Sequence, residues 1–209
     1  MRQLFGERDF LSYFFARQSS LLAFSIEDVA VSWQIFALRH NPLDLGLVGL
    51  VLFLPQLLLA LPAGVLADRV DRRSICVAST IAEAAGLLLF VALVVAHVQS
   101  LTIYLSAVGV IGVAHSIGIP AQRSLLANIV RSHHFVRAQA FSSSVGQLIT
   151  IAGPALGGAL IILGAQLAFG AAAVTYAIAA IAFAFLPSRE VAQPEEAPLE
   201  AAMKGVHFI

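Results

Sequence analysis

Long stretches of the chain carry no charged side chain. Residues 45–67, 84–122 and 138–188, which are 23, 39 and 51 residues long, contain no Asp, Glu, Lys or Arg. A helix needs about 20 apolar residues to cross the hydrocarbon core of a bilayer, so the longest stretch is predicted to hold two spans and a short turn. Backbone polar groups must be paired inside the bilayer, which leaves helices or a closed barrel. Because the stretches are apolar on all sides and lack the alternation of barrel strands, they predict helices.

Six membrane-spanning helices are predicted in this way. They cover residues 10–38, 45–67, 74–96, 101–126, 137–163 and 166–186. Short connections join the third helix to the fourth and the fifth to the sixth, so each pair is expected to be antiparallel and adjacent. The first helix is not expected to be a cleaved signal peptide, because Glu7, Asp9 and Arg17 interrupt it and its apolar stretch is too long. The predicted fold class is therefore all-α integral membrane.

The composition supports a membrane protein and excludes several other classes. Only 11% of the 209 residues are charged, against about 25% in an ordinary soluble domain, and the mean hydropathy is +0.90. Twelve basic and twelve acidic side chains leave no net charge, which excludes a nucleic-acid binder that depends on a basic surplus. The high hydrophobic content excludes disorder. The single cysteine, Cys76, excludes an internal disulfide framework.

Basic residues near the helix ends predict the orientation in the membrane. One side would carry nine of them, and the other side only Arg39. The nine are Arg2, Arg8, Arg69, Arg72, Arg73, Arg131, Arg137, Arg189 and Lys204. Since Lys and Arg favour the cytoplasmic side, both termini are predicted to be cytoplasmic.

The end of the chain differs in composition from the helices. Residues 187–199 are rich in Pro and Glu, which is typical of a solvated linker. Residues 203–209 then return to an apolar pattern around Lys204 and His207. We therefore expect residues 1–186 to form one bundle and residues 187–209 to begin a cytoplasmic linker, and we expect the chain to be a fragment of a longer protein.

The first predicted helix carries the most polar side chains. Arg17 and Asp28 are 11 positions apart, which is about three helical turns, so they share a face. Glu27 and Gln34, seven positions apart, form a second stripe beside it. This broad polar face is expected to line a water-filled cavity or to pack on other polar helices. Asp28, near mid-span, is the first candidate for the proton-coupling or substrate-cation site. The alternative is a static pair with Arg17 or a hydroxyl network.

Three further polar residues are weaker candidates for the same site. Glu83 in the third helix could line a cavity, but a hydrogen bond to a neighbouring helix is the favoured reading. His115 in the fourth helix is interpreted as a hydrogen-bonded packing residue rather than a ligand. Gln147 belongs to the polar first half of the fifth helix. No second His or Cys lies at metal-ligand spacing in the spans, so neither a metal nor another cofactor is expected.

The fifth helix also carries a cluster of glycines around a proline. Pro154 removes a backbone hydrogen bond and is predicted to kink the helix. Gly153, Gly157 and Gly158 allow another helix to approach closely. A moving gate is the functional reading of this segment. The alternative is a dimerisation face formed by Gly153 and Gly157.

Sequence motifs argue against an enzyme. The chain contains no HExxH, GxxxxGK[ST] or GxSxG motif and no paired CxxC. We therefore expect the protein not to be an enzyme.

Residues 64–73 read Gly-Val-Leu-Ala-Asp-Arg-Val-Asp-Arg-Arg and lie between the second and third predicted helices. This segment resembles the motif that the major facilitator superfamily carries at the same place. The resemblance implies a gating role for Gly64, Asp68, Arg69, Asp71, Arg72 and Arg73. Asp68 is expected to accept from a helix N-terminus, and the arginines to pair with carboxylates. Alternatively, the arginines only set the topology.

Other segments resemble the bacterial exporter branch of this superfamily, which includes the enterobactin exporter and macrolide efflux pumps. They include residues 41–49 and 120–123 and the Gly-Pro pair at Gly153 and Pro154. Asp28 falls where this branch often carries an acid. The resemblance implies a twelve-helix transporter of two six-helix halves, of which this chain is the N-terminal half.

The resemblance implies a function and its partners. We expect a secondary active transporter in the bacterial inner membrane that exports a small amphiphilic molecule, such as a siderophore or drug, by proton-coupled alternating access. The expected partners are that substrate, membrane lipid, and a missing C-terminal half or a second copy, without nucleic acid. The alternatives are a non-transporting scaffold or truncated remnant, and a half-size transporter that works as a homodimer.

Overall fold

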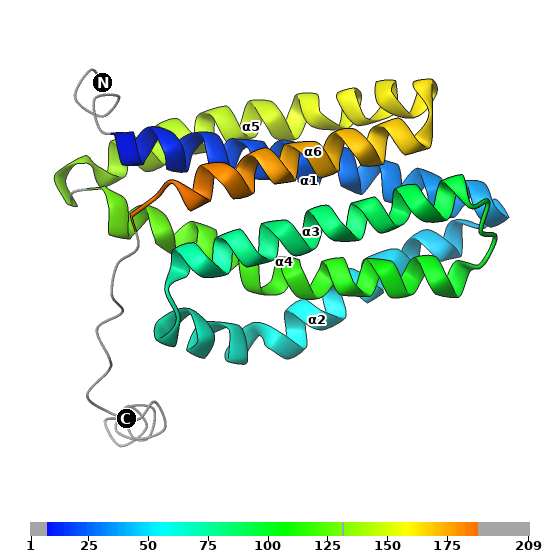
Figure 1. Ribbon diagram of the computed structural model, residues 1–209, viewed down its shortest axis with the longest axis horizontal. Helices are drawn as coiled ribbons and strands as arrows, with labels where there is room; N and C mark the ends of the chain where they lie inside the picture. Colours follow the sequence, from blue (N-terminus) through cyan, green and yellow to red (C-terminus); the bar gives the residue numbers. More distant parts are fainter. Residues whose placement is uncertain (1–7, 131, 188–209) are drawn as a thin grey trace.

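The computed structural model describes residues 8–130 and 132–187. Six α-helices account for nearly all of them (Figure 1). The helices are α1 (Arg8–Arg39), α2 (Pro42–Arg69), α3 (Arg72–Val95), α4 (Leu101–Ile129), α5 (Ser132–Leu163) and α6 (Ala165–Ala184). Each is long and apolar enough to cross a membrane. The prediction of an all-α membrane bundle with six spans is therefore confirmed.

Most helix boundaries differ from the prediction, by one to five residues. Helix α2 continues to Arg69, so Asp68 lies within it and only Val70 and Asp71 separate it from α3. Helix α5 begins at Ser132, five residues before its predicted start. Hydropathy marks the part of a helix that lies in hydrocarbon, whereas the backbone pairing that forms the helix continues into the polar interface. The predicted loops are correspondingly shorter in the structure.

Local chemistry explains where several helices begin. The Asn41 side chain caps α2 by accepting from the backbone N–H of Leu43, and Pro42 occupies the first turn, where its missing N–H costs little. Between α5 and α6, Gly164 has a φ of 139°, a conformation that side chains rarely tolerate. This glycine permits the direct reversal from α5 to α6.

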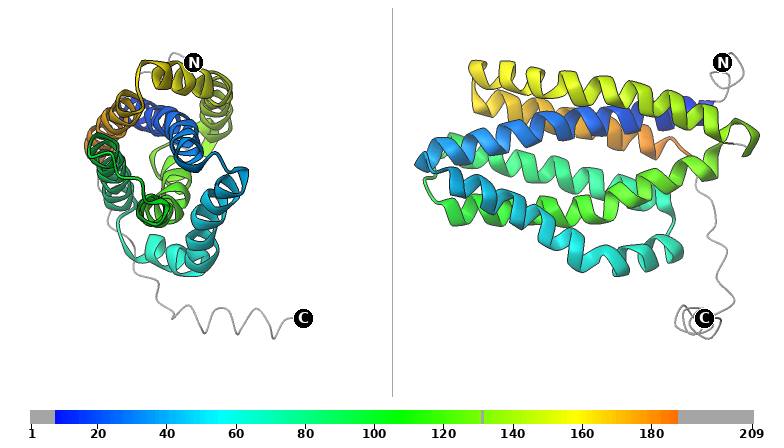
Figure 2. Two further views of the ribbon diagram at one scale, coloured as in Figure 1. Left: turned by 90° about the vertical axis from the view of Figure 1, so that its right-hand side faces the viewer. Right: turned by 180° about the vertical axis from the view of Figure 1, so that it is seen from behind.

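The helices form a continuous series of packed neighbours. Helix α1 packs between α5 and α6, α6 packs on α3, α3 on α4, and α4 on α2. The end-on view shows α2 and α5 on the periphery (Figure 2). Helix α2 packs mainly on α4, and α5 mainly on α1, so both leave much of their surface uncovered. Helix α1 begins and α6 ends at the same end of the bundle (Figure 1).

Aromatic side chains fill the centre of the bundle. Phe90 of α3 lies 4.9 Å from Phe169 of α6 and 5.5 Å from Tyr104 of α4, measured between ring centroids. All three are fully buried. Aromatic pairs at such distances stabilise a core beyond the area that they bury. The contacts fix α3, α4 and α6 relative to one another around the polar residues described next.

Candidate functional site

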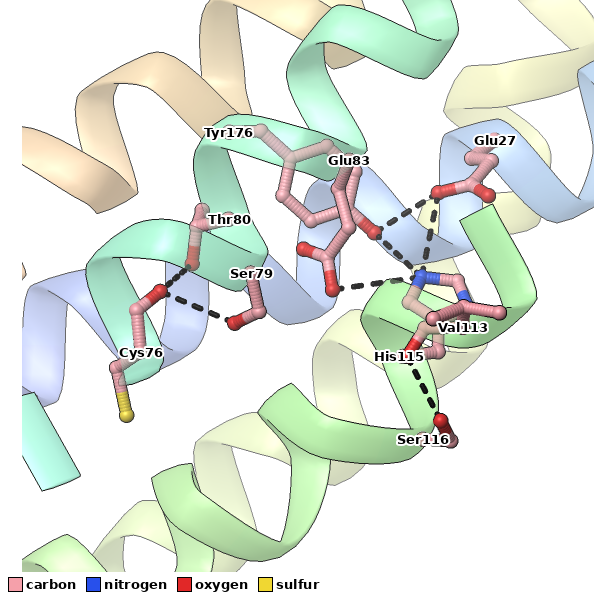
Figure 3. A network of polar contacts seen from close by, with 9 residues as sticks. All are labelled: Glu27, Cys76, Ser79, Thr80, Glu83, Val113, His115, Ser116 and Tyr176. Carbon is pink, nitrogen blue, oxygen red and sulfur yellow. Dashed lines mark hydrogen bonds and ion pairs between the residues drawn. The ribbon is translucent and has the colours of Figure 1, made fainter. Parts of the chain in front are cut away.

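Four polar side chains from four helices meet in the middle of the bundle (Figure 3). The hydroxyl of Tyr176 on α6 donates a hydrogen bond to Glu27 Oε2 on α1 at 2.8 Å. His115 Nε2 on α4 lies 3.3 Å from that hydroxyl and 3.7 Å from Glu27 Oε2. It also lies 3.8 Å from Glu83 Oε1 on α3. All four residues are buried, and we name Glu27, Glu83, His115 and Tyr176 the mid-bundle cluster.

Glycines on α3 and α4 bring these two helices close enough to form the cluster. A Cβ atom added at Gly118 would lie 2.8 Å from Ser79 Cβ and 3.5 Å from Glu83 Oε1. A Cβ atom at Gly86 would lie 2.6 Å from Ile111 Cγ1. Both spacings are too short for a real side chain, so the backbones depend on glycine there. The close approach lets a side chain of α4 reach the carboxyl group of Glu83.

Asp28 lies beside the mid-bundle cluster but outside it. Unlike its neighbour Glu27, Asp28 is exposed, because adjacent residues of a helix point about 100° apart. A cavity of about 10 Å³ is lined by both acids and by His115, with apolar residues of α2 and α4 around them. That volume is close to what one water molecule needs. Asp28 is therefore separated from the buried groups only by this small space.

The other candidates on α1 and α5 are not part of the cluster. The Gln34 side chain lies 3.5 Å from the Tyr104 hydroxyl, at the limit of a hydrogen bond. Arg17 is partly buried, and no ion pair joins it to Asp28 among the described residues. Gln147 is exposed on α5. The structure thus brings together Glu27, Glu83 and His115 and leaves these three residues apart.

Tyr176 is a member of the cluster that the sequence did not single out. It lies in α6, whose sequence is almost uniformly apolar and gives no polar stripe to follow. The one available signal is that Tyr176 and Thr175 are the only polar side chains between Leu167 and Ala184. A buried Tyr hydroxyl usually has a hydrogen-bond partner, so this tyrosine predicts a polar neighbour.

The segment that resembles the superfamily motif makes contacts at the end of the bundle where α1 begins and α6 ends. The Asp71 carboxylate caps α3, since it accepts from the backbone N–H of Arg73 at 3.3 Å. The Arg73 side chain donates to the carbonyl oxygen of Ala184, where α6 ends. A cation at a helix C-terminus is favourable. Asp71 thus occupies the capping position expected for Asp68, whereas the side chains of Asp68 and Arg69 lie outside the described residues.

Gly153 and Gly157 of α5 face α1 within the bundle, whereas no atom lies within 4 Å of a Cβ atom added at Gly158, which therefore does not serve a close helix approach. A Cβ atom at Gly157 would lie 3.3 Å from the Cα atom and the carbonyl oxygen of Ile26. At Gly153 it would lie 3.0 Å from Ser25 Oγ and still closer to Ser25 Cβ. The face that could have formed a dimer is therefore covered by α1 of the same chain. Helix α5 continues through Pro154, and the predicted kink stays a prediction.

A larger apolar cavity lies between α2, α3 and α4. Its volume is about 440 Å³, within the range of small-molecule sites. Leu66, Ile75, Val110 and Ile117 are among its lining residues, and Ser79 contributes a hydroxyl group. Ser79 lies one turn of α3 from Glu83, so this cavity adjoins the mid-bundle cluster. An apolar space beside buried acids suits a molecule with both apolar and polar parts.

Potential metal ligands do not gather in the part of the chain that the structure describes. It contains no group of three or more His, Cys, Asp or Glu residues that could hold a metal ion. The site is instead a set of hydrogen-bonded polar groups inside six membrane-spanning helices. This arrangement defines a multi-pass membrane protein whose ionisable groups lie at membrane depth, where they mark substrate or ion pathways.

Comparison with known proteins identifies the family of the chain. The family model of transmembrane secretion effectors matches residues 5–208. A protein of Bacillus subtilis (strain 168), described as the uncharacterized MFS-type transporter YfiS, is 31% identical to this chain over 186 residues. The chain belongs to the transmembrane secretion effector family of the major facilitator superfamily. The match covers 83% of this chain but only 42% of that relative, so the chain spans less than half of its length.

Proposed function

We propose that this chain forms one half of a secondary active transporter that exports a small amphiphilic molecule by alternating access. The observation that carries the proposal is the polar centre of the bundle, where Asp28 is exposed beside the buried Glu27. Ionisable groups inside a membrane are costly and serve ion or substrate movement. The family and the apolar cavity beside the acids support an amphiphilic substrate. The proposed setting is the bacterial inner membrane, with both termini cytoplasmic.

Coupling to protons completes the proposed mechanism. A carboxyl group that alternates between the two sides of a membrane carries one proton per cycle, so it links transport to the proton gradient. Asp28 is the exposed acid near the middle of α1, and it borders the small cavity next to Glu27. We propose that it exchanges protons or contacts a cationic substrate at this surface.

A second bundle is part of the proposal. Helices α2 and α5 have large exposed apolar side chains, among them Leu57, Leu58, Leu148 and Ile151. Alternating access in this superfamily needs two bundles that rock against each other around a central site. A C-terminal half or a second copy of this chain would supply the other side.

Transport into inverted membrane vesicles tests the proposed function. Ethidium, a fluorescent amphiphilic cation, should accumulate in vesicles that contain the gene product when their interior is acidified. The Asp28→Asn variant should lose this gradient-driven accumulation but still let ethidium equilibrate down its own gradient. Asp44→Asn is the matched control, because Asp44 lies beside Arg39, away from the polar centre. Equal accumulation with and without the proton gradient would contradict proton coupling.

A further inference from the structure

We propose that the mid-bundle cluster, rather than the exposed Asp28, holds the proton that drives transport. The inference rests on the proposed function, because it names the groups that perform the coupling within it. Asp28 then acts as the entry point between the cluster and the open surface of the bundle. Three features of the structure carry the proposal: the charge balance of the cluster, an unpartnered oxygen atom, and the cavity that joins the cluster to Asp28.

The charge balance of the cluster is incomplete without a bound proton. Two carboxyl groups, Glu27 and Glu83, share a single imidazole, that of His115. No Lys or Arg pairs with either acid among the ion pairs of the described residues. Even with His115 protonated, the cluster keeps one negative charge when both acids are ionised. One further proton brings it to neutrality, and burial strongly favours a neutral set of groups.

Glu83 has a vacant position for that proton. Its Oε1 atom lies 3.8 Å from His115 Nε2, whereas its Oε2 atom is buried and has no hydrogen-bond partner. Glu83 is 2% exposed, so water from outside the bundle does not solvate this oxygen. An ionised carboxylate with an unsatisfied buried oxygen is costly. A proton on Glu83 removes the charge and leaves its partners in place.

The hydrogen bonds allow the proton to move within the cluster. The Tyr176 hydroxyl donates to Glu27, and its oxygen is then free to accept from His115 Nε2. His115 Nε2 also lies 3.7 Å from Glu27 and 3.8 Å from Glu83. In the tautomer that leaves Nε2 unprotonated, this nitrogen can accept a proton from Glu27 and then pass it to Glu83. Each transfer forms one O–H or N–H bond and breaks another. Uptake and release exchange a single proton with water, and no electron is transferred.

The cavity of about 10 Å³ supplies a route to the surface. Glu27, Asp28 and His115 all line it, and it is close to the size of one water molecule. One water in this space would bridge the exposed Asp28 carboxylate and the buried groups. The route opens on the face of α1 that carries Asp28, where the proposed function places the path between the two bundles.

Among the described residues, the neighbouring helices add no other ionisable side chain to the cluster or its small cavity. Helix α1 contributes Glu27 and Asp28, α3 contributes Glu83, α4 contributes His115, and α6 contributes Tyr176. Helix α2 lines the cavity only with Val48 and Leu52. Helix α5 packs on α1 through glycines, and its residues 138–163 contain no ionisable side chain. A pH response at mid-membrane therefore belongs to these five residues.

Infrared difference spectroscopy of the purified gene product tests the inference without any substrate. Acidification across neutral pH should produce the C=O absorption of one protonated carboxyl group per chain. We expect Glu83→Gln to remove this absorption, because the amide keeps the shape of the side chain but binds no proton. Asp44→Asn, the same chemical change outside the cluster, should retain it. Glu27→Gln serves as a second variant and should also remove or displace the absorption.

Several outcomes would overturn the inference. The first is a wild-type spectrum that shows no pH-dependent protonated carboxyl group, because the cluster would then hold no exchangeable proton. Loss of the absorption in Asp28→Asn together with its retention in Glu83→Gln and Glu27→Gln would place the proton on Asp28 instead. The infrared test and the vesicle assay can give independent results. If the absorption depends on Glu83 but ethidium uptake does not follow the gradient, the proton site is retained and the proposed function is rejected. If gradient-driven uptake survives both Glu83→Gln and Glu27→Gln, the proposed function is retained and the proton site is rejected.

Discussion

Adjacent acids on α1 have opposite surroundings. Glu27 is 4% exposed and accepts a hydrogen bond from Tyr176, whereas Asp28 is open to the surface of the bundle. The difference follows from the angle of about 100° between successive side chains on a helix. A buried group is held in one geometry by its partners, while an exposed group is free to meet water, a substrate or a second bundle. The pair thus joins the interior of the bundle to its open face.

At this scale, two of the three buried tyrosines, Tyr13 and Tyr176, provide a matched pair of variants. Tyr176→Phe removes the hydroxyl that donates to Glu27, so the pH dependence of the infrared absorption should change. Tyr13→Phe removes a hydroxyl that donates to the Gln122 carbonyl at 3.0 Å, and it should cost about 1 kcal/mol of stability without moving the pH profile. Titration of the infrared absorption and thermal unfolding measure the two effects. An unchanged pH profile in Tyr176→Phe would argue against this role for its hydroxyl.

The sequence predicted the polar stripes of α1 but not which stripe would be buried. The seven-residue spacing of Glu27 and Gln34 placed them on one face, and the spacing of Arg17 and Asp28 placed these on the next. Both stripes carry one acid, so charge alone does not decide between them. The choice depends on the shapes of α5 and α6, which meet α1 through Gly157 and Tyr176. Those contacts join residues more than 100 positions apart in the sequence. The spacing of residues within one helix cannot predict such contacts.

Close helix contacts at the element scale depend on single glycines. Gly157 of α5 faces the backbone of α1 at Ile26, and Gly112 of α4 faces the backbone of α2 at Leu52. In both cases the backbone of the partner lies 3.3 Å from the position of a Cβ atom. Without a strong hydrophobic force between helices in lipid, such packing is a main source of their association. Hydropathy was therefore sufficient to predict the six helices. It could not predict which helices pack together, because that depends on which glycine faces which backbone.

Neighbouring glycines of α5 allow a direct test of this packing. Gly157→Ala should push α5 away from α1 and lower stability by about 1–3 kcal/mol, as overpacking commonly does. Gly158→Ala should be neutral or slightly stabilising, because no atom lies within 4 Å of the added methyl group. The melting temperature of the purified protein in detergent measures both. Equal melting temperatures for the two variants would contradict the packing of Gly157 on α1.

The whole molecule is a bundle with its two described ends on one side. Helix α1 begins where α6 ends, and the connections from α1 to α2 and from α3 to α4 lie at the opposite end (Figures 1 and 2). An even number of spans requires this arrangement. The distribution of Lys and Arg predicts that the side with the termini is cytoplasmic.

Cysteine labelling in whole cells tests this orientation. In a Cys76→Ala background, a thiol introduced by His40→Cys should react with an impermeant reagent added outside. One introduced by Ser74→Cys should stay unmodified until the membrane is opened. Both positions are exposed and lie at opposite ends of the bundle. The reverse labelling pattern would overturn the proposed topology.

Alternating access is the central claim for the molecule, and labelling at Ser32 tests it most directly without knowledge of the substrate. Ser32 lies one turn of α1 beyond Asp28, and Ser32→Cys in the Cys76→Ala background replaces its hydroxyl with a thiol of similar size. We predict that an impermeant thiol reagent modifies this cysteine from both sides, in right-side-out and in inverted vesicles, with proportions that change with the pH gradient. Ser74→Cys should react from the cytoplasmic side alone. Modification of the Ser32→Cys variant from one side only at every pH, or from neither side, would contradict alternating access.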